Sequence, residues 1–342
     1  MELKIGLIGK GTVGTSFLKL LKEKEQLIEE IYGVKCIITA VFERDGAFID
    51  DKGINPEEIL NNYSSLKKTD IWKSKLNAKD FLSELDLDIC IETTTTNPET
   101  AEPGLTHILI ALKNKIDVIS SNKAPFYLAY NMIRKVAQES NSIVKYEATV
   151  GSGIPVLSIK ELLLGTSITG IKAILNGTNN YILSRMTSEG ISFNVALKEA
   201  QELGYAEANP YLDISGHDAA GKLVILANEL LNRSFKINDV QIEGISNVTP
   251  QAIELAILDG YVIKHLAIVE DDQILLEPRL IKKDSPLNVG GTLNIIEIET
   301  KHTGSLFLIG NGAGGNEAAS AILNDMLCII KERLKILDEE RS

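Results

Sequence analysis

An α/β fold with two domains is predicted by three features of the sequence. A short apolar run, Leu3–Ile8, leads into the glycine turn GKGTVG at residues 9–14, and apolar residues at helical spacing follow. Further strands and helices alternate through the first part of the chain, whereas three strand-like runs follow one another within residues 261–299. Alternation is typical of a parallel sheet, and consecutive strands are typical of an antiparallel sheet. We therefore expect an N-terminal Rossmann-type dinucleotide-binding domain plus an α+β catalytic and dimerisation domain.

The length of 342 residues supports two domains rather than one. We place the dinucleotide-binding domain at residues 1–140 and the catalytic and dimerisation domain at residues 141–310. Residues 311–342 are expected to form a glycine turn and a helix that return to the first domain.

The composition excludes several classes of protein. A net charge of −12 argues against a nucleic-acid or anionic-membrane surface, and no apolar run approaches the roughly 20 residues of a membrane span. The N-terminus lacks the zones of a signal peptide. Cys36, Cys90 and Cys328 are too far apart for a disulfide framework or a zinc knuckle. These features predict a cytoplasmic protein.

The first glycine turn predicts a site for NAD or NADP. Gly9, Gly11 and Gly14 can provide a tight turn, a backbone that approaches a pyrophosphate, and close packing of helix on strand. Thr12 and Val13 then open a helix whose free N–H groups attract phosphate.

The residues after the second strand, Cys36–Phe42, bear on the choice between NAD and NADP. An acidic residue here binds the ribose hydroxyls of NAD, and an arginine favours the extra phosphate of NADP. Glu43 and Arg44 offer both, and Arg44 could equally be a solvated turn residue. The choice stays open, with a slight lean to NADP.

Polar side chains follow the next two strands, Leu87–Ile91 and Asp117–Ser120. Ligands bind beyond the carboxyl ends of strands in open α/β sheets, so Thr94 and Lys123 lie where a nicotinamide and a substrate could meet. Thr94 could otherwise serve to cap a helix. Lys123 stands between a strand end and a proline, an unusual position for a solvated lysine.

Two further turns precede helices. The turn TVGSGIP at residues 149–155 is followed by an expected apolar helix through Leu164. Its carbonyl oxygens, together with Glu147, suit a hard or monovalent cation, although a simple domain crossover is slightly favoured as the explanation of this turn. The turn at residues 310–315 follows the strand Leu306–Ile309, begins a helix to about Leu337, and is expected to touch the cofactor.

The segment Gly204–Lys222 carries three carboxylates and one amine: Glu207, Asp213, Asp218 and Lys222. They directly precede an apolar helix, which indicates a partly buried pocket suited to a small zwitterion and its protons. Burial lowers the pKa of a lysine and nearby carboxylates raise it, so this balance stays open. His217 is expected to be structural or exposed. Upstream, the turn Asn176-Gly177-Thr178 after the strand Ile168–Ile174 can cap a helix or hold a carboxylate.

These motifs resemble the homoserine dehydrogenase family. Six segments match in order along nearly the whole chain: GKGTVG, SNKAP, EATVGSGIP, ILNGTNNYIL, GYAEANPYLDISGHDAAGKL and GNGAGGNEAASA. The resemblance implies NAD(P)-dependent interconversion of L-homoserine and L-aspartate 4-semialdehyde, on the route to threonine, methionine and isoleucine. We expect a homodimer formed through the sheet of the second domain.

The resemblance also implies roles for single residues. Lys222 looks like the proton donor and acceptor, with Lys123 also lining the catalytic centre. Glu207 looks like the group that binds homoserine, with Asp213 and Asp218 shaping the same site. Cofactor contacts would come from the first glycine turn, Thr94, Lys123 and Gly312. A sodium-type cation would be held by Glu147 and by the backbone oxygens of Val150, Ser152 and Ile154.

The chain departs from the family pattern at two positions. Asn179 stands where the family usually has threonine, and Asn209 stands where it usually has aspartate. Neither residue is assigned to the chemistry, so the expected activity is unaffected. The chain has no room for a regulatory module or a fused aspartate kinase, and threonine feedback is therefore not expected.

Two other functions compete with this interpretation. An acylating semialdehyde dehydrogenase needs an accessible nucleophilic cysteine, and all three cysteines fall within expected apolar strands or the last helix. A non-catalytic dinucleotide sensor would not need the acid–lysine pocket.

Overall fold

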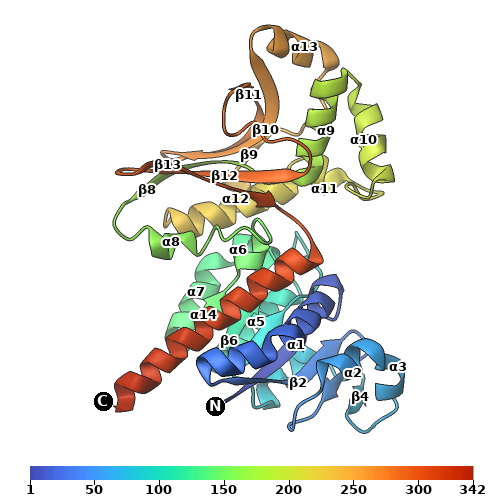
Figure 1. Cartoon of the computed structure of the whole chain (residues 1–342), viewed down its shortest axis with the longest axis vertical. Coiled ribbons are helices and arrows are strands. Elements are labelled where there is room, and N and C mark those ends of the chain that lie inside the picture. Colours follow the sequence, from blue (N-terminus) through green and yellow to red (C-terminus); the bar gives the residue numbers. More distant parts are fainter. Residues whose placement is uncertain (342) are drawn as a thin grey trace. The chain divides into compact units, whose positions relative to one another are not determined.

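The structure, a computed structural model, describes residues 1–341, with side chains described for residues 1–336 (Figure 1). The chain divides into two compact units. The first unit consists of Met1–Thr149 together with Gly314–Ser342, and the second unit of Val150–Ala313. The predicted fold class is confirmed, because the first unit has a Rossmann-type parallel sheet and the second unit combines an antiparallel sheet with helices.

Within the described residues, the first unit is built on a seven-stranded sheet in the order β4-β3-β2-β1-β5-β6-β7. Its parallel strands are β1 (Glu2–Ile8), β2 (Lys35–Glu43), β5 (Ile89–Glu92), β6 (Asp117–Ser120) and β7 (Val144–Lys145). Two antiparallel strands extend one edge, β3 (Gly46–Ile49) and β4 (Trp72–Ser74). Because β1 pairs with β2 on one side and β5 on the other, the order of connections reverses beside β1, where open α/β sheets bind ligands.

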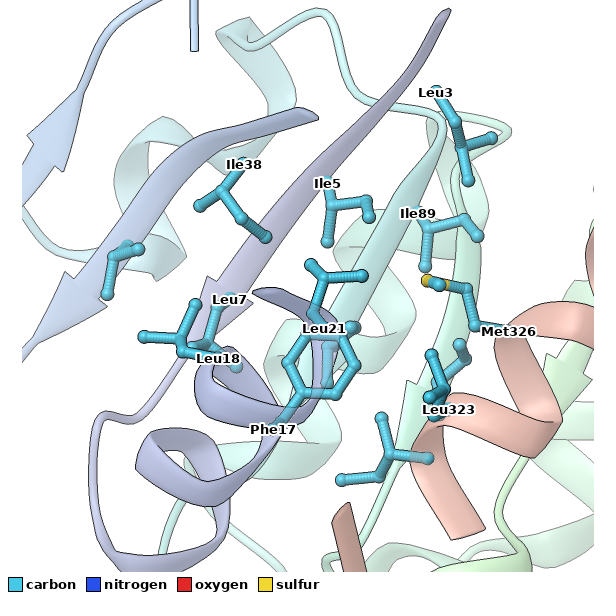
Figure 2. Packing of buried hydrophobic residues seen from close by; sticks show 14 of the residues in the cluster. Leu3, Ile5, Leu7, Phe17, Leu18, Leu21, Ile38, Ile89, Leu323 and Met326 are labelled. Atoms are coloured by element: carbon cyan, nitrogen blue, oxygen red, sulfur yellow. The ribbon is translucent and has the colours of Figure 1, made fainter. Parts of the chain in front are cut away.

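Helices α1 and α14 pack on one face of this sheet. The α-helices of the unit are α1 (Thr12–Tyr32), α2 (Pro56–Asn61), α3 (Tyr63–Leu66), α4 (Ala78–Phe81), α5 (Gly104–Lys113), α6 (Ala124–Leu128), α7 (Tyr130–Ser140) and α14 (Gly315–Arg341), and 3-10 turns span Leu82–Glu84 and Glu147–Thr149. Alternate residues of a strand share one face, and those of β1 meet Phe17 of α1 and Met326 of α14 in one buried core (Figure 2). The last helix of the chain thus completes the core of the first unit.

The second unit has a six-stranded sheet in the order β13-β12-β8-β10-β11-β9 within the described residues. The strands are β8 (Ile168–Ile174), β9 (Gln241–Ile242), β10 (Tyr261–Glu270), β11 (Gln273–Lys282), β12 (Leu293–Thr300) and β13 (Gly304–Asn311). The helices are α8 (Ile159–Leu162), α9 (Gly177–Glu189), α10 (Phe193–Glu202), α11 (Tyr211–Ile214), α12 (His217–Leu230) and α13 (Pro250–Leu258), with a 3-10 turn at Ile237–Asp239. Helix α12 is buried along almost its whole length, which fixes the residues at its start.

Most strand positions match those expected from the sequence, with two differences. The helix expected through Leu164 is wrong, because only the single turn α8 forms and Leu162 and Leu164 remain 82% and 86% exposed. A short helix without a packed apolar face gains little stability. The second difference is a hairpin after β2, where the chain turns at Arg44 into antiparallel β3, a strand of only four residues.

Among the residues described, no helix has the length and apolar character needed to cross a membrane.

Candidate active site

The three glycines of the first turn differ in their surroundings. Gly9 has a φ of +97°, and a Cβ there would lie 2.9 Å from the Thr93 carbonyl oxygen. A Cβ on Gly14 would lie 2.2 Å from the Gly9 carbonyl oxygen, so no side chain fits where helix α1 crosses the turn. A Cβ on Gly11 would meet no atom within 4 Å. Gly11 is therefore not needed for packing, and its open side leaves the backbone accessible to a ligand.

The start of helix α1 has the properties of a phosphate site. The N-cap residue Gly11 provides no side-chain hydrogen bond, and no acidic residue occupies the first turn. Thr12 is exposed and Val13 packs partly against the core, so the first turn is anchored on one side and open on the other. Unpaired N–H groups and the positive end of the helix dipole favour a pyrophosphate here. The residues present therefore fit a dinucleotide.

The end of β2 combines one engaged carboxylate with several cations. The Tyr63 hydroxyl donates to Glu43 Oε2 at 2.7 Å, and Glu43 Oε1 is buried without a hydrogen-bond partner. The ammonium groups of Lys10 and Lys67 lie 4.0 Å and 4.8 Å from the Tyr63 ring centroid. Arg44 is exposed at the hairpin turn. Lys67 Nζ also donates to Asp45 Oδ2 at 2.6 Å, so its charge is already paired, whereas Lys10 and Arg44 have no ion pair among the described residues.

The fully buried carboxylate of Glu92, at the end of β5, organises the residues around Thr94. Its Oε1 accepts hydrogen bonds from the Thr94 hydroxyl and, at 3.1 Å, from the Thr94 amide. Asn122, at the end of β6, donates its Nδ2–H to the Thr94 hydroxyl at 3.3 Å. Lys123 follows directly as the N-cap of α6 and is half-buried. The structure thus links the segments that carry Thr94 and Lys123.

The sequence interpretation missed Glu92 and Asn122. Glu92 lies two residues before Thr94, Asn122 directly precedes Lys123, and both are almost fully buried. The available signal was a glutamate closing the apolar run Ile89–Ile91, because a charge at a buried strand end needs partners.

In the second unit, the Lys222 side chain is buried, and both of its described contacts are to oxygen atoms. Its Nζ lies 2.8 Å from Asp218 Oδ2 and donates to the Leu175 carbonyl oxygen at 2.9 Å. The side chains of Lys222 and Asp218 are 9% and 19% exposed, so solvent screens this pair less than a surface pair. Asp218 also lies in the first turn of α12, where the helix dipole favours a negative charge.

Asp213 joins the same cluster, whereas Glu207 does not. The Asn176 side chain donates its Nδ2–H to Asp213 Oδ1 at 2.6 Å and to Asp218 Oδ2 at 3.2 Å. Glu207 is exposed, and among the described residues only its backbone oxygen takes part in a hydrogen bond, from Gln201 at 3.1 Å. Three of the four predicted charges therefore meet, and the fourth lies on the open segment before α11.

Asn179 and His265 fix the backbone beside this cluster. The Asn179 Nδ2 donates to the Asp213 carbonyl oxygen at 2.7 Å and lies 3.0 Å from His265 Nδ1. Burial lowers the pKa of His265 to about 4, so the ring is neutral near pH 7. Its Nε2 donates to the Glu243 carbonyl oxygen at 2.9 Å, which leaves Nδ1 as the acceptor. His217, by contrast, is exposed, which is one of the two placements expected from the sequence.

Gly312 lies against a fully buried amide. A Cβ on Gly312 would stand 1.9 Å from Asn294 Nδ2, so only glycine fits. Both polar side-chain atoms of Asn294 are buried without a hydrogen-bond partner. Gly315, the first residue of α14, packs in turn against Thr12.

The residues of the predicted cation turn are buried. The four residues are each at most 6% exposed: Glu147, Val150, Ser152 and Ile154. Gly151 and Ser152 have φ values of 72° and 51°, which redirects successive peptide groups. The Ile154 oxygen accepts from the Val156 amide at 2.8 Å. No group of three or more His, Cys, Asp or Glu suitable for a metal occurs in the described part of the chain.

Comparisons with known proteins agree with these features. The family profile for homoserine dehydrogenase matches residues 155–327, and the profile for its NAD-binding domain matches residues 9–147. The chain belongs to the homoserine dehydrogenase family. A homoserine dehydrogenase of Methanocaldococcus jannaschii is 39% identical over 337 residues, which are 97% of this chain and 100% of the relative. An NAD(+)-dependent homoserine dehydrogenase of Pseudomonas canavaninivorans is 34% identical, over 96% of each chain.

Solved homoserine dehydrogenase structures share the fold. A putative homoserine dehydrogenase from Archaeoglobus fulgidus superposes with a TM-score of 0.88 at 36% identity, covering 96% of this chain and 99% of its own. A hyperthermophilic archaeal homoserine dehydrogenase in complex with NADPH gives a TM-score of 0.83 at 28% identity, covering 98% of both chains.

The chain is accordingly an NAD(P)-dependent oxidoreductase that acts on a CH–OH group, and not an acylating dehydrogenase. Burial raises the pKa of Cys36 to about 12 and raises that of Cys90 as well, so neither provides a thiolate near pH 7. Cys328 lies in α14, within a helix rather than at a strand end.

Proposed function

We propose that Lys222 exchanges the proton of the homoserine hydroxyl in this reaction. The observation that supports the proposal is its placement, because the ammonium group is buried and held by the Asp218 carboxylate and the Leu175 carbonyl oxygen. Two fixed acceptors orient one N–H bond of the three away from them, toward a third acceptor. A positioned proton donor of this kind contributes about 10²–10⁴-fold to a rate.

The substrate's charged groups are assigned to neighbouring residues. Glu207 binds the amino group, and its exposed carboxylate on the segment after Gly204 is open to a ligand. Asp213 and Asp218 shape the site and are held in place by Asn176. The substrate is L-homoserine in one direction and L-aspartate 4-semialdehyde in the other, and the pathway served is synthesis of threonine, methionine and isoleucine.

The dinucleotide is assigned to the first unit and to Gly312. Its pyrophosphate is held by the turn Gly9–Gly14, at the uncapped start of α1. Thr94 is fixed by Glu92 for contact with the nicotinamide end, and Lys123 contacts both cofactor and substrate. The bound nicotinamide supplies the hydride chemistry, and the protein supplies orientation and proton transfer.

We further propose that NADP is preferred over NAD. Glu43, which could bind the ribose hydroxyls, is engaged by Tyr63, and Lys10 and Arg44 leave cationic groups at the same edge. The 2′-phosphate that distinguishes NADP from NAD is stabilised by such cationic side chains. The NADPH-bound archaeal homologue is consistent with this preference, whereas the Pseudomonas relative is described as NAD(+)-dependent.

Formation of reduced cofactor from L-homoserine tests both proposals. We expect the wild type to reduce NADP with a higher kcat/KM than NAD. Arg44→Ala should lower kcat/KM for NADP about tenfold or more and leave kcat/KM for NAD unchanged, because one charge-assisted contact is worth about 1.5–3 kcal/mol. Arg134→Ala, which removes an exposed arginine of α7, is the matched control. An equal effect on both cofactors would refute the role of Arg44, and no activity with homoserine would refute the function.

We also propose a sodium-type monovalent cation bound by Glu147 and the backbone oxygens of Val150, Ser152 and Ile154. The support is the burial of all four residues and the left-handed conformation at Gly151 and Ser152. We expect turnover to fall several-fold when sodium and potassium are replaced by a bulky organic cation, because no large cation fits a buried carbonyl site. Unchanged turnover would count against the cation.

The assembly is proposed to be a cytoplasmic homodimer that pairs through the sheet of the second unit. Strand β13 lies at one edge of that sheet, and its Phe307 and Ile309 are 38% and 53% exposed. An edge strand with exposed apolar side chains favours pairing with another chain. Sedimentation equilibrium measures the resulting mass.

A further inference from the structure

The side chain of Asn176 uses both ends of its amide at the junction between β8 and α9. It is the N-cap of α9, and its Oδ1 accepts the Asn179 amide at 2.9 Å. Its Nδ2 donates to Asp213 Oδ1 at 2.6 Å and to Asp218 Oδ2 at 3.2 Å. The residue is 6% exposed, so these bonds form away from bulk water. One neutral side chain therefore ties the start of a helix to two carboxylates.

One carboxylate oxygen of Asp218 contacts both Asn176 and Lys222. Asp218 Oδ2 lies 2.8 Å from Lys222 Nζ and also accepts the Asn176 Nδ2–H. The second acceptor of the ammonium group is the carbonyl oxygen of Leu175, the residue immediately before Asn176. Both acceptors of Lys222 are thus positioned by Asn176, one through its side chain and the other through its backbone.

The charge balance around Lys222 requires an amide at this position. Among the described contacts, Asp218 on α12 pairs with the amine directly and Asp213 on α11 is linked to it through Asn176, while His265 on β10 contacts Asn179 and is neutral near pH 7. Glu207 is exposed outside the hydrogen-bonded cluster. An amide donates two N–H groups to two carboxylates without adding charge. A carboxylate in its place would donate neither bond and would add a further negative charge.

We propose that Asn176 is a positioning residue for the proton transfer, which it serves by fixing Asp218 and the Leu175 carbonyl around the Lys222 amine. This role rests on the proposed function of Lys222. Asn176 does not itself exchange the proton, since its amide is fully used by the cap and the two carboxylates.

Two substitutions separate positioning from helix capping. Asn176→Asp and Asn176→Ser both keep a residue that caps helices well, so α9 retains its start. Asn176→Ser removes the two bonds to the carboxylates and adds no charge. Asn176→Asp removes the same bonds and adds a negative charge near Lys222. Asn288→Asp is the matched control, because Asn288 is exposed in the same unit and likewise donates its Nδ2–H to a carbonyl oxygen, that of Lys283 at 3.0 Å.

The readout that does not depend on turnover is competitive labelling of lysine amines at a series of pH values, followed by mass spectrometry of the Lys222 peptide. We expect the pH of half-maximal labelling of Lys222 to rise by about one unit in Asn176→Asp, because a nearby carboxylate stabilises the ammonium form. It should stay within about 0.3 units of wild type in Asn176→Ser and Asn288→Asp. Thermal unfolding verifies that each variant is folded.

Turnover provides the second measurement. Asn176→Ser should lower kcat about tenfold or more with the dissociation constant for NADPH unchanged, whereas Asn288→Asp should retain wild-type kcat. An unshifted labelling pH in folded Asn176→Asp, or wild-type kcat in Asn176→Ser, would overturn the role of Asn176. A wild-type enzyme that is inactive with homoserine would instead overturn the proposed function, so the two failures are distinguishable.

Discussion

Replacing Lys222 by alanine is expected to lower turnover of homoserine by about 10²–10⁴-fold, the usual contribution of a positioned acid or base. The amine is buried against Asp218 and the Leu175 carbonyl oxygen, and alanine removes the group that exchanges the proton. The dissociation constant for NADPH should stay within about twofold, because the pyrophosphate turn belongs to the other unit of the chain. Stopped-flow measurement of cofactor reduction and fluorescence titration with NADPH give the two values.

Lys160→Ala is the matched control for this loss. Lys160 also donates to a carbonyl oxygen and faces a carboxylate, both belonging to Glu229, at 2.5 Å and 3.5 Å. Lys160→Ala removes the same kind of lysine contacts within the second unit, and turnover of this variant should remain near that of wild type. A small primary amine added to Lys222→Ala should restore part of the rate. Near-normal turnover in Lys222→Ala would remove this residue from the proton transfer.

Several strands could be predicted because their local patterns are strong. Strands β6 and β8 occupy the residues that the apolar runs indicated, and β10 and β11 form a hairpin, with Glu270 paired to Gln273, where consecutive strands were expected. Each of these signals is carried by neighbouring residues. Strand β3 was not anticipated, because its four residues form a strand through pairing with β2 rather than through a pattern of their own.

The candidate site shows the same division between local and distant information. Asp218 and Lys222 are four residues apart on one helix, so their contact follows from helical spacing. The connection of Asp213 to them runs through Asn176, which lies 37 residues earlier. Glu92 binds Thr94 locally, but Ser120 reaches Glu92, and Asn122 reaches Thr94, from the next strand of the sheet. Such partners depend on tertiary packing, which a single sequence does not display.

Gly14→Ala is expected to disrupt the first unit and its cofactor site together. The added methyl group would lie 2.2 Å from the Gly9 carbonyl oxygen, in backbone rather than in a flexible side chain. Overpacking of this kind costs about 1–3 kcal/mol or more, and 1–3 kcal/mol corresponds to a fall in Tm of roughly 2–12 °C for a unit of this size. Displacing helix α1 also moves the N–H groups of its first turn, so binding of NADPH should weaken at least about tenfold.

Gly11→Ala separates cofactor binding from folding. A Cβ on Gly11 meets no atom within 4 Å, and the φ of −76° is ordinary for alanine. Alanine is a poorer N-cap residue than glycine by about 0.5–1 kcal/mol, so the Tm without cofactor should fall by no more than about 4 °C. If a pyrophosphate approaches this backbone, the methyl group blocks it, and titration should show NADPH affinity reduced about tenfold or more. Wild-type affinity in Gly11→Ala would mean that the phosphates bind elsewhere, even if Gly14→Ala unfolds as expected.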